Sequence, residues 1–305
     1  MNSTIHPASV RTIAKKDFLD AVRSWVFWLL SAFFFALLAI GAIAFWYLAQ
    51  EGVVPEASTE LLLTNVTQVT RLVIPVIALL LGWKAIAGER EAGSMKVLLS
   101  LPHSRSDVVL GKLLGRSAVL SLSLGVGFAL AAVVVATLMG GFAVGDYLGV
   151  LAMSIVYGVA YVSIAVAIST LTKSTSVAAT GIFGVFVLFY LVWNVLFSII
   201  SMLVELDYIA GVTWDTVDIN GAYPLERPPD WAYLIDLIDP GTAYSTTLSL
   251  VTRSVEIGFG PGDQEQLFPD GVPFYLQDWF GLIVLIAWIL VPLAIAFYRF
   301  DRVDL

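Results

Sequence analysis

The chain has 305 residues and a formal net charge of −8; 59% of its residues are hydrophobic and only 13% are charged. Soluble domains have about 25% charged residues, and apolar runs of about 18 residues or more indicate membrane spans, so the sequence predicts a multi-pass membrane protein. The lack of cysteine excludes disulfides, thiolate nucleophiles and cysteine-ligated metal sites, and two histidines (His6 and His103) argue against a multi-histidine metal site.

The acidic balance comes mainly from aspartate. The chain holds 15 Asp against 9 Glu, and 6 Lys against 10 Arg. Carboxylates keep a surface hydrated in concentrated salt, so this balance fits a salt-loving source such as a halophilic archaeon. An ordinary acidic external loop explains the same excess equally well.

An amphipathic helix is expected over residues 8–24, before the first span. Apolar side chains recur there with the period of a helix, and Lys15 and Lys16 are among the basic residues on the rest of its surface. We expect this helix to lie on the membrane surface, with its basic residues toward anionic lipid headgroups.

Six membrane spans are predicted within a single transmembrane domain that takes in residues 1–305. With the N-terminus in the cytoplasm, 13 of the 16 Lys and Arg residues lie in inner segments. The positive-inside rule therefore places both termini in the cytoplasm and the chain in the plasma membrane. The spans are expected at residues 25–49, 66–87, 117–138, 148–171, 177–203 and 279–298.

Polar and small residues within the predicted spans mark candidate helix contacts. We expect Arg71 in the second span to snorkel to the surface; alternatively, it faces the bundle interior as a substrate or ion-pair contact. We expect Asn194 in the fifth span to hydrogen-bond another helix, and lining a substrate path is the alternative. Gly111 and Gly115 have the G-x-x-x-G spacing that permits close helix crossings.

An acidic outer loop is predicted over residues 205–278, between the fifth and sixth spans. It holds thirteen acidic and only two basic residues. Within it, Asp239 followed by Pro240 indicates a helix start, because Asp caps and Pro occupies the first position without losing a hydrogen bond. That helix is expected over residues 241–253. The loop is long enough for a small folded cap.

A charged inner segment, residues 84–116, joins the second and third spans. Nine of its 33 residues are charged and six of these are basic, a density that requires contact with water. Gly93 and Pro102 bracket a predicted helix of about two turns. Ser104 and Asp107 have the spacing of a capping box, which predicts a second helix over 108–116 that continues into the third span. Short helices joined directly to two spans can transmit force.

Three motifs follow one another along this inner segment. They are Gly-Glu-Arg-Glu-Ala-Gly-Ser at 88–94, Leu-Leu-Ser-Leu-Pro at 98–102 and Ser-Arg-Ser-Asp-Val-Val-Leu-Gly-Lys at 104–112. This arrangement resembles the inner segment of ABC-2 type transporter permeases. The amphipathic helix, the six spans and Ile-Asp-Pro at 238–240 before a short outer helix extend the resemblance over most of the chain.

The resemblance implies a fold, a set of partners and a coupling interface. The expected fold is an all-α membrane protein with an N-terminal interface helix, six transmembrane helices, cytoplasmic coupling helices between spans two and three, and an extracellular acidic loop. Two permease copies, or this chain and a paralogue, would pair with two copies of a separate ABC ATPase to form an exporter. The resemblance assigns the ATPase-coupling interface to Glu89, Arg90, Glu91, Gly93, Ser94, Leu98, Leu101 and Pro102.

The chain itself is not expected to be an enzyme. It lacks the G-x-x-x-x-G-K-[ST] phosphate loop, so ATP and Mg²⁺ would bind to the partner ATPase; no cofactor and no nucleic acid is expected on this chain. An ion-driven secondary transporter is one alternative, but such proteins normally carry ionisable residues at mid-span, where this chain has little besides Arg71. A membrane assembly factor acting through the acidic outer loop is the other.

Overall fold

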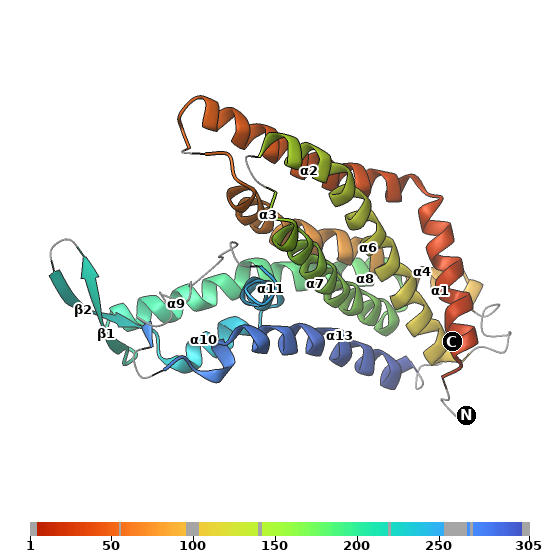
Figure 1. The fold of residues 1–305 in the computed structure, drawn as a ribbon. Helices are drawn as coiled ribbons and strands as arrows, with labels where there is room; N and C mark the ends of the chain where they lie inside the picture. Colours follow the sequence, from red (N-terminus) through yellow and green to blue (C-terminus); the bar gives the residue numbers. More distant parts are fainter. Residues whose placement is uncertain are drawn as a thin grey trace.

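The computed structural model describes residues 5–54, 56–95, 104–139, 142–218, 221–252, 267–268 and 271–300, with the backbone alone over 214–218 and 221–225. In this part of the chain, six helical segments are long and apolar enough to cross a membrane (Figure 1). This confirms the predicted number of spans and their approximate places; the side of the membrane on which each end lies stays a prediction. The segments are α2 (Trp25–Gln50), α3 (Thr59–Gly82) with α4 (Ala87–Glu91), α6 (Arg105–Leu138), α7 (Val144–Leu171), α8 (Thr175–Val187) with η1 (Leu188–Val192) and α9 (Trp193–Glu205), and α13 (Asp278–Phe300).

Capping side chains set the starts of two of these helices. Ser58 accepts a hydrogen bond from the N–H of Leu61 at 3.2 Å, so α3 begins at Thr59, well before the predicted residue 66. At α6, the Ser104 hydroxyl accepts from the N–H of Asp107 at 3.0 Å, and the Asp107 carboxylate accepts from the N–H of Ser104 at 2.9 Å. The predicted capping box is confirmed, and α6 runs without a break from the inner segment into the third span.

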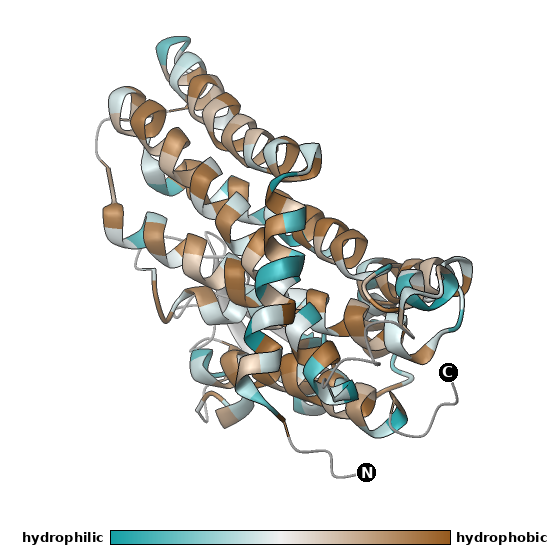
Figure 2. Cartoon of the chain, turned by 90° about the vertical axis from the view of Figure 1, so that its right-hand side faces the viewer, coloured by the Kyte–Doolittle hydropathy of each residue, from teal (hydrophilic) through white to brown (hydrophobic). Residues whose placement is uncertain are grey.

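α1 (Pro7–Val22) is the predicted amphipathic helix, and teal and brown turns alternate along it in Figure 2. Its apolar face is covered by protein, because Val10 and Ile13 are buried and lie against α6. A Cβ added at Gly111 would lie 2.6 Å from Cγ2 of Ile13, and one at Gly115 would lie 2.9 Å from Cβ of Asp17. The predicted glycine crossing is therefore present, and α6 occupies part of the face that was expected on the membrane.

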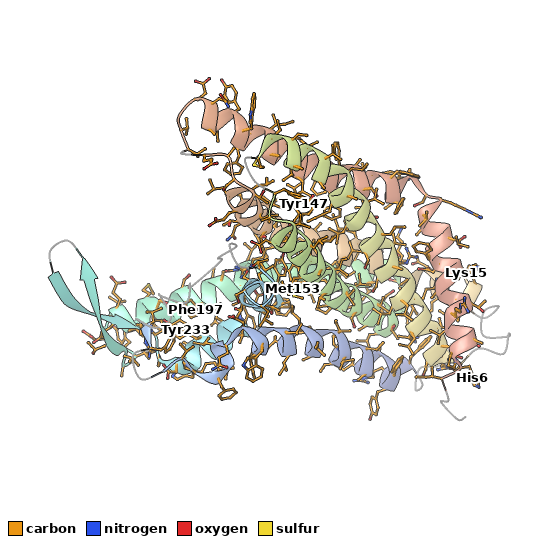
Figure 3. All side chains as sticks on the ribbon, in the orientation of Figure 1. His6, Lys15, Tyr147, Met153, Phe197 and Tyr233 are labelled. Carbon is orange, nitrogen blue, oxygen red and sulfur yellow. The ribbon has the colours of Figure 1, made fainter. Side chains whose placement is uncertain are left out.

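The outer loop departs from an all-helical fold. β1 (Val212–Asp218) and β2 (Gly221–Arg227) form an antiparallel hairpin, which the sequence reading did not predict. α10 (Asp230–Leu237), α11 (Pro240–Leu248) and η2 (Phe274–Leu276) complete the described part of the loop. Figure 3 shows Phe197 and Tyr233 near the hairpin at one end of the molecule, and His6 and Lys15 on the α1 side at the other.

α11 begins where it was predicted but is shorter and more enclosed. Asp239 accepts a hydrogen bond from the N–H of Thr242 at 2.8 Å, which confirms the cap, while the helix ends at Leu248 rather than at residue 253. The helix lies between α7 and α13, and a Cβ added at Gly281 of α13 would lie 2.8 Å from the carbonyl oxygen of Ala243 (Figure 1). This outer helix is thus part of the bundle.

Packing is uneven across the bundle. In the most apolar stretch of α7, 67% of the residues are buried, whereas in the stretch running through α8 and α9 only 11% are. α7 is held close to its neighbours by small residues: a Cβ at Gly82 of α3 would collide with Ala165, and one at Gly158 would lie 3.3 Å from Ile74. α3 and α7 therefore form a tightly packed pair, and the stretch from α8 to α9 is the most exposed of the six spans.

The α1–α6 crossing gives a direct test of this packing. We expect Gly111→Ala to lower the free energy of unfolding by about 1 to 3 kcal/mol, because the added methyl group must displace Ile13 or separate the two helices. Gly125→Ala on the same helix is the matched control, since a Cβ there meets no atom within 4 Å. Thermal unfolding in detergent measures both, and equal midpoints for the two variants would show that the crossing is not close.

Candidate functional site

α4 is held at a sharp corner after α3 by one hydroxyl group. Oγ of Ser169, near the end of α7, accepts hydrogen bonds from the N–H groups of Ile86 and Ala87 at 3.0 and 2.9 Å. The same hydroxyl donates to the carbonyl oxygen of Trp83 at 2.8 Å. Ser169 is fully buried, so three backbone groups that the turn frees from helical bonding are satisfied without water.

Glu89 on α4 takes part in a cluster of four charges, two of them buried. Its carboxylate lies 2.6 Å from Nζ of Lys112 on α6, and the same Nζ lies 2.9 Å from the carboxylate of Asp17 on α1. Nε of Arg116 lies 2.8 Å from the other oxygen of Asp17. We call Asp17, Glu89, Lys112 and Arg116 the inner charge cluster. Two positive and two negative charges cancel, which is what permits Lys112 and Asp17 to be buried.

Arg90 joins α4 to the ends of two further helices. Its Nη1 donates hydrogen bonds to the carbonyl oxygens of Thr170 and Thr172 at 2.9 Å each, where α7 ends. A cation is favourable at this position because unpaired carbonyl groups make the end of a helix negative. The guanidinium also lies 4.9 Å from the ring centre of Phe300, the last residue of α13, and Arg105 bonds the carbonyl of Phe300.

The remaining predicted interface residues lie on the outward side of α4 or outside the described part. Glu91 is exposed and accepts a hydrogen bond from the N–H of Thr175 at 2.9 Å, at the start of α8. Gly93 and Ser94 are exposed, and Gly93 has a φ of 74°, a left-handed conformation that favours glycine. The predicted interface residues that lie outside the described residues are Leu98, Leu101 and Pro102.

The charged residues of the motif thus have two kinds of surroundings. Glu89 and Arg90 point into the bundle and connect α4 to α1, α6, α7 and α13, while the stretch from Glu91 to Ser94 forms an exposed edge. Sequence reasoning missed Asp17 as a member of the site. It is an acidic residue next to Lys15 and Lys16 and, unlike Asp20, it lies on the buried face with Val10 and Ile13; that placement was the available signal.

A second polar group lies in the middle of the bundle, around Arg71 on α3. Pro75 has no N–H, so the carbonyl group of Arg71 four residues earlier loses its helical hydrogen bond. The hydroxyl of Tyr157 on α7 donates to that carbonyl at 2.9 Å instead. The backbone irregularity in α3 is therefore satisfied by α7.

The side chain of Arg71 is paired with the start of α11. Its Nη2 lies 3.1 Å from Oδ2 of Asp239 and 2.9 Å from Oγ1 of Thr242. Gly241 makes this approach possible, because a Cβ there would lie 2.8 Å from Nε of Arg71. The expectation of snorkelling is wrong, since the helix start at Asp239 supplies a counter-charge within the bundle; the ion-pair alternative is the one observed.

Asn194 bonds its own helix rather than another one. Its Nδ2 donates to the carbonyl oxygens of Tyr190 at 2.9 Å and Phe189 at 3.5 Å, within the π-helical turn η1. A π-turn displaces carbonyl groups from their usual partners, and the amide satisfies them locally. Within this chain the amide of Asn194 bonds its own helix, and a bond to another helix stays a prediction.

Arg71 and Asn194 both line a cavity of about 290 Å³. Its walls come from α3, α7, the stretch from α8 to α9, and the start of α11. We call this space the Arg71 cavity. The residues that line it are Gln68, Arg71, Leu72, Pro75, Tyr157, Tyr161, Phe186, Phe189, Tyr190, Asn194, Asp239 and Gly241.

Asp236, one turn before Asp239 in the outer loop, has a perturbed acidity. Burial raises the pKa of its carboxyl group to about 6, and the nearby charge of Asp239 acts in the same direction while Arg71 opposes it. The side chain therefore changes charge close to neutral pH, next to the Arg71–Asp239 pair.

Comparison with known proteins gives one family and two relatives. The family described as ABC-2 family transporter protein matches residues 11–305. NosY of Pseudomonas aeruginosa, described as a probable ABC transporter permease protein, is 34% identical over 195 residues, which is 61% of this chain and 68% of the relative. NosY of Stutzerimonas stutzeri, described in the same words, is 32% identical over 201 residues, or 64% of this chain and 72% of the relative.

Lys112→Met tests the inner charge cluster. The substitution leaves Asp17 and Glu89 without the ammonium group between them, so we expect the free energy of unfolding to fall by about 3 kcal/mol or more. Lys84→Met is the control, because Lys84 is exposed and such substitutions change stability by about 0.5 kcal/mol at most. Thermal unfolding in detergent distinguishes them, and a stable Lys112→Met variant would contradict this four-charge cluster.

Asp236→Asn tests the acidity of the outer loop. An unfolded Asp has a pKa of about 4, so between pH 4 and about 6 the folded protein binds the extra proton and loses stability as the pH rises. We expect Asp236→Asn to remove this slope and to raise the unfolding temperature at pH 7. Glu205→Gln, an exposed carboxylate in the same loop, should leave the slope in place. Unfolding temperatures measured across this pH range check both expectations.

Proposed function

This chain belongs to the ABC-2 transporter family and is a permease subunit, and from this premise we propose that it couples ATP hydrolysis by a separate ATPase subunit to the export of a substrate across the plasma membrane. Both relatives are described as probable ABC transporter permeases. The family membership favours this class over the ion-driven transporter and the assembly factor. The complex would contain two ATPase copies and a second permease copy or a paralogue.

The observation that carries the proposal is the placement of α4 between an exposed edge and the ends of the transmembrane helices. Glu91, Gly93 and Ser94 face outward, where a partner protein can contact them. Behind them, Glu89 and Arg90 contact groups from α6, α7 and α13 through an ion pair, hydrogen bonds and a cation–π contact, and Lys112 extends the ion pairing to α1. A displacement of α4 by an ATPase would therefore reach several helices at once.

The direction of force transmission follows from how these contacts are paired. Charged groups buried in a neutral cluster resist separation, because each one left alone costs several kcal/mol. We propose that α4 moves together with the inner ends of α1 and α6, and that it does not slide past them. In this proposal the two residues first assigned to docking, Glu89 and Arg90, transmit force, whereas the exposed edge recognises the ATPase.

Co-expression with an ABC ATPase encoded beside this chain tests the proposal. We expect Ser94→Trp to reduce co-purification of the ATPase about tenfold or more, because the indole projects from the exposed edge and blocks close contact. Ser249→Trp is the matched control at the end of α11. Like Ser94, Ser249 is exposed and its hydroxyl bonds a backbone carbonyl.

The unfolding temperature and the ATPase activity of each preparation complete the test. Both variants should keep the unfolding temperature of the unmodified chain, while only Ser94→Trp should lose ATPase activity that depends on the permease. Full ATPase binding by Ser94→Trp would remove the exposed edge of α4 from the proposed interface. A functional chain that never binds an ATPase would overturn the proposal itself.

A further inference from the structure

We infer that the Arg71 cavity is a binding site for the anionic head of a single-chain amphiphile, with a carboxylate, sulfate or phosphate group at Arg71 and the chain along the aromatic wall. The inference rests on the proposed function, because it gives the exporter a class of cargo. Four features of the cavity carry this inference: its place inside a candidate span, its accessible charge, its aromatic wall and the irregular backbone around it.

The cavity lies beside the middle of α3, inside the second candidate span. Arg71 is twelve residues from the start of α3 at Thr59 and eleven from its end at Gly82. At 1.5 Å per residue, the guanidinium-bearing residue is about 18 Å from one end of the helix and about 16 Å from the other. A charged side chain inside a membrane span is costly, so its presence indicates a function as well as a structural contact.

The accessible charge in the cavity is positive. Asp239 has only 5% of its side chain exposed, because its Oδ2 caps α11 and accepts from Thr242 as well as Arg71. Arg71 keeps 28% of its side chain exposed, and both of its hydrogen bonds come from Nη2. Among the described residues, no acceptor bonds Nε or Nη1 of Arg71, so the guanidinium has donors left for an anion.

The wall formed by the stretch from α8 to α9 is mainly aromatic and uncharged, with the amide of Asn194 among its side chains. Phe186 and Tyr190 stack with ring centres 5.4 Å apart and planes within 9° of parallel. Phe189 packs edge-on against Trp288, with ring centres 5.1 Å apart. Such a surface excludes water from the ligand but offers no further charge, which suits a hydrocarbon chain beside an anionic head. A volume of about 290 Å³ accommodates one chain segment better than the two chains of a bilayer lipid.

Two elements around the cavity depart from regular helix geometry, and a third helix begins there. α3 contains Pro75, the wall contains the π-turn at 188–192, and the capped start of α11 lies beside the cavity. Irregular backbone in a membrane span costs free energy unless it lies in protein or lines a cavity, and broken helices are where membrane transporters hold their substrates. Two irregular turns and a helix start around one cavity point to a ligand site.

A bromine-labelled fatty acid provides the binding probe, since bromine quenches tryptophan fluorescence and Trp288 lies behind the cavity wall. The full complex is reconstituted in nanodiscs of zwitterionic phosphatidylcholine and titrated without ATP. We expect saturable quenching that dodecyl sulfate competes away and that dodecyltrimethylammonium and inorganic phosphate do not. Equal competition by the cationic detergent would overturn the inference.

Two sets of variants locate the binding. Arg71→Gln combined with Asp239→Asn keeps the pair hydrogen-bonded and uncharged, and we expect it to weaken binding at least tenfold; Arg71→Lys should keep most of the affinity. Phe186→Ala should weaken binding, whereas Phe183→Ala should not, because Phe183 is 67% exposed and lies outside the cavity. Unchanged affinity in both the double variant and Phe186→Ala would place the fatty acid elsewhere and overturn the inference.

The same preparation distinguishes two sources of the amphiphile. It also tests this inference separately from the proposed function. Nanodiscs containing phosphatidylglycerol show whether an anionic membrane lipid displaces the probe; displacement assigns the site to a resident lipid, and retention assigns it to a single-chain cargo. Binding is measured without ATP, so it can also be measured on a chain that proves to have no ATPase partner. Probe binding by such a chain would overturn the proposed function and leave this inference standing. An active ATPase complex that binds no probe would overturn this inference alone.

Discussion

No water reaches a polar group inside a lipid bilayer, so every backbone group that a helix leaves unpaired must be satisfied by the protein. The middle of this bundle is organised by that constraint. Tyr157 satisfies the carbonyl that Pro75 frees in α3, and Asn194 satisfies carbonyls in the π-turn. Each irregular turn is thus tied to a side chain, and those on α3 and η1 meet at the Arg71 cavity.

The inner end of the bundle obeys the same constraint with charges in place of backbone groups. Lys112 is buried because Asp17 and Glu89 lie on either side of it, and the two anions are held there by α1 and α4. The cluster therefore joins three segments that are far apart in sequence. The cluster also explains why a charged motif that resembles a docking surface is only partly exposed. Glu89 and Arg90 pair with groups inside the bundle, and only the stretch from Glu91 to Ser94 faces outward.

The sequence was most informative where the pattern is local. Hydropathy indicated six spans, and the capping residues Ser104 and Asp239 marked two helix starts correctly, because a cap depends only on neighbouring residues. It was least informative where the partner is remote. Arg71 pairs with a residue 168 positions away, and Lys112 with one 95 positions away, so no window along the chain contains both members. The hairpin was missed because the acidic loop lacks the strong alternation that marks strands.

Uneven packing connects the inner cluster to the cavity. α3 leads directly into α4 and is packed against α7 through Gly82 and Gly158, so the two helices respond to a displacement as one body. The opposite wall of the cavity belongs to the stretch from α8 to α9, which is the most exposed span of this chain and contains the π-turn. A force on α4 would move the Arg71 wall relative to the aromatic wall. The cavity would change shape because α4 is joined to one wall through α3 and α7, while few residues of the other wall are buried against the rest of the bundle.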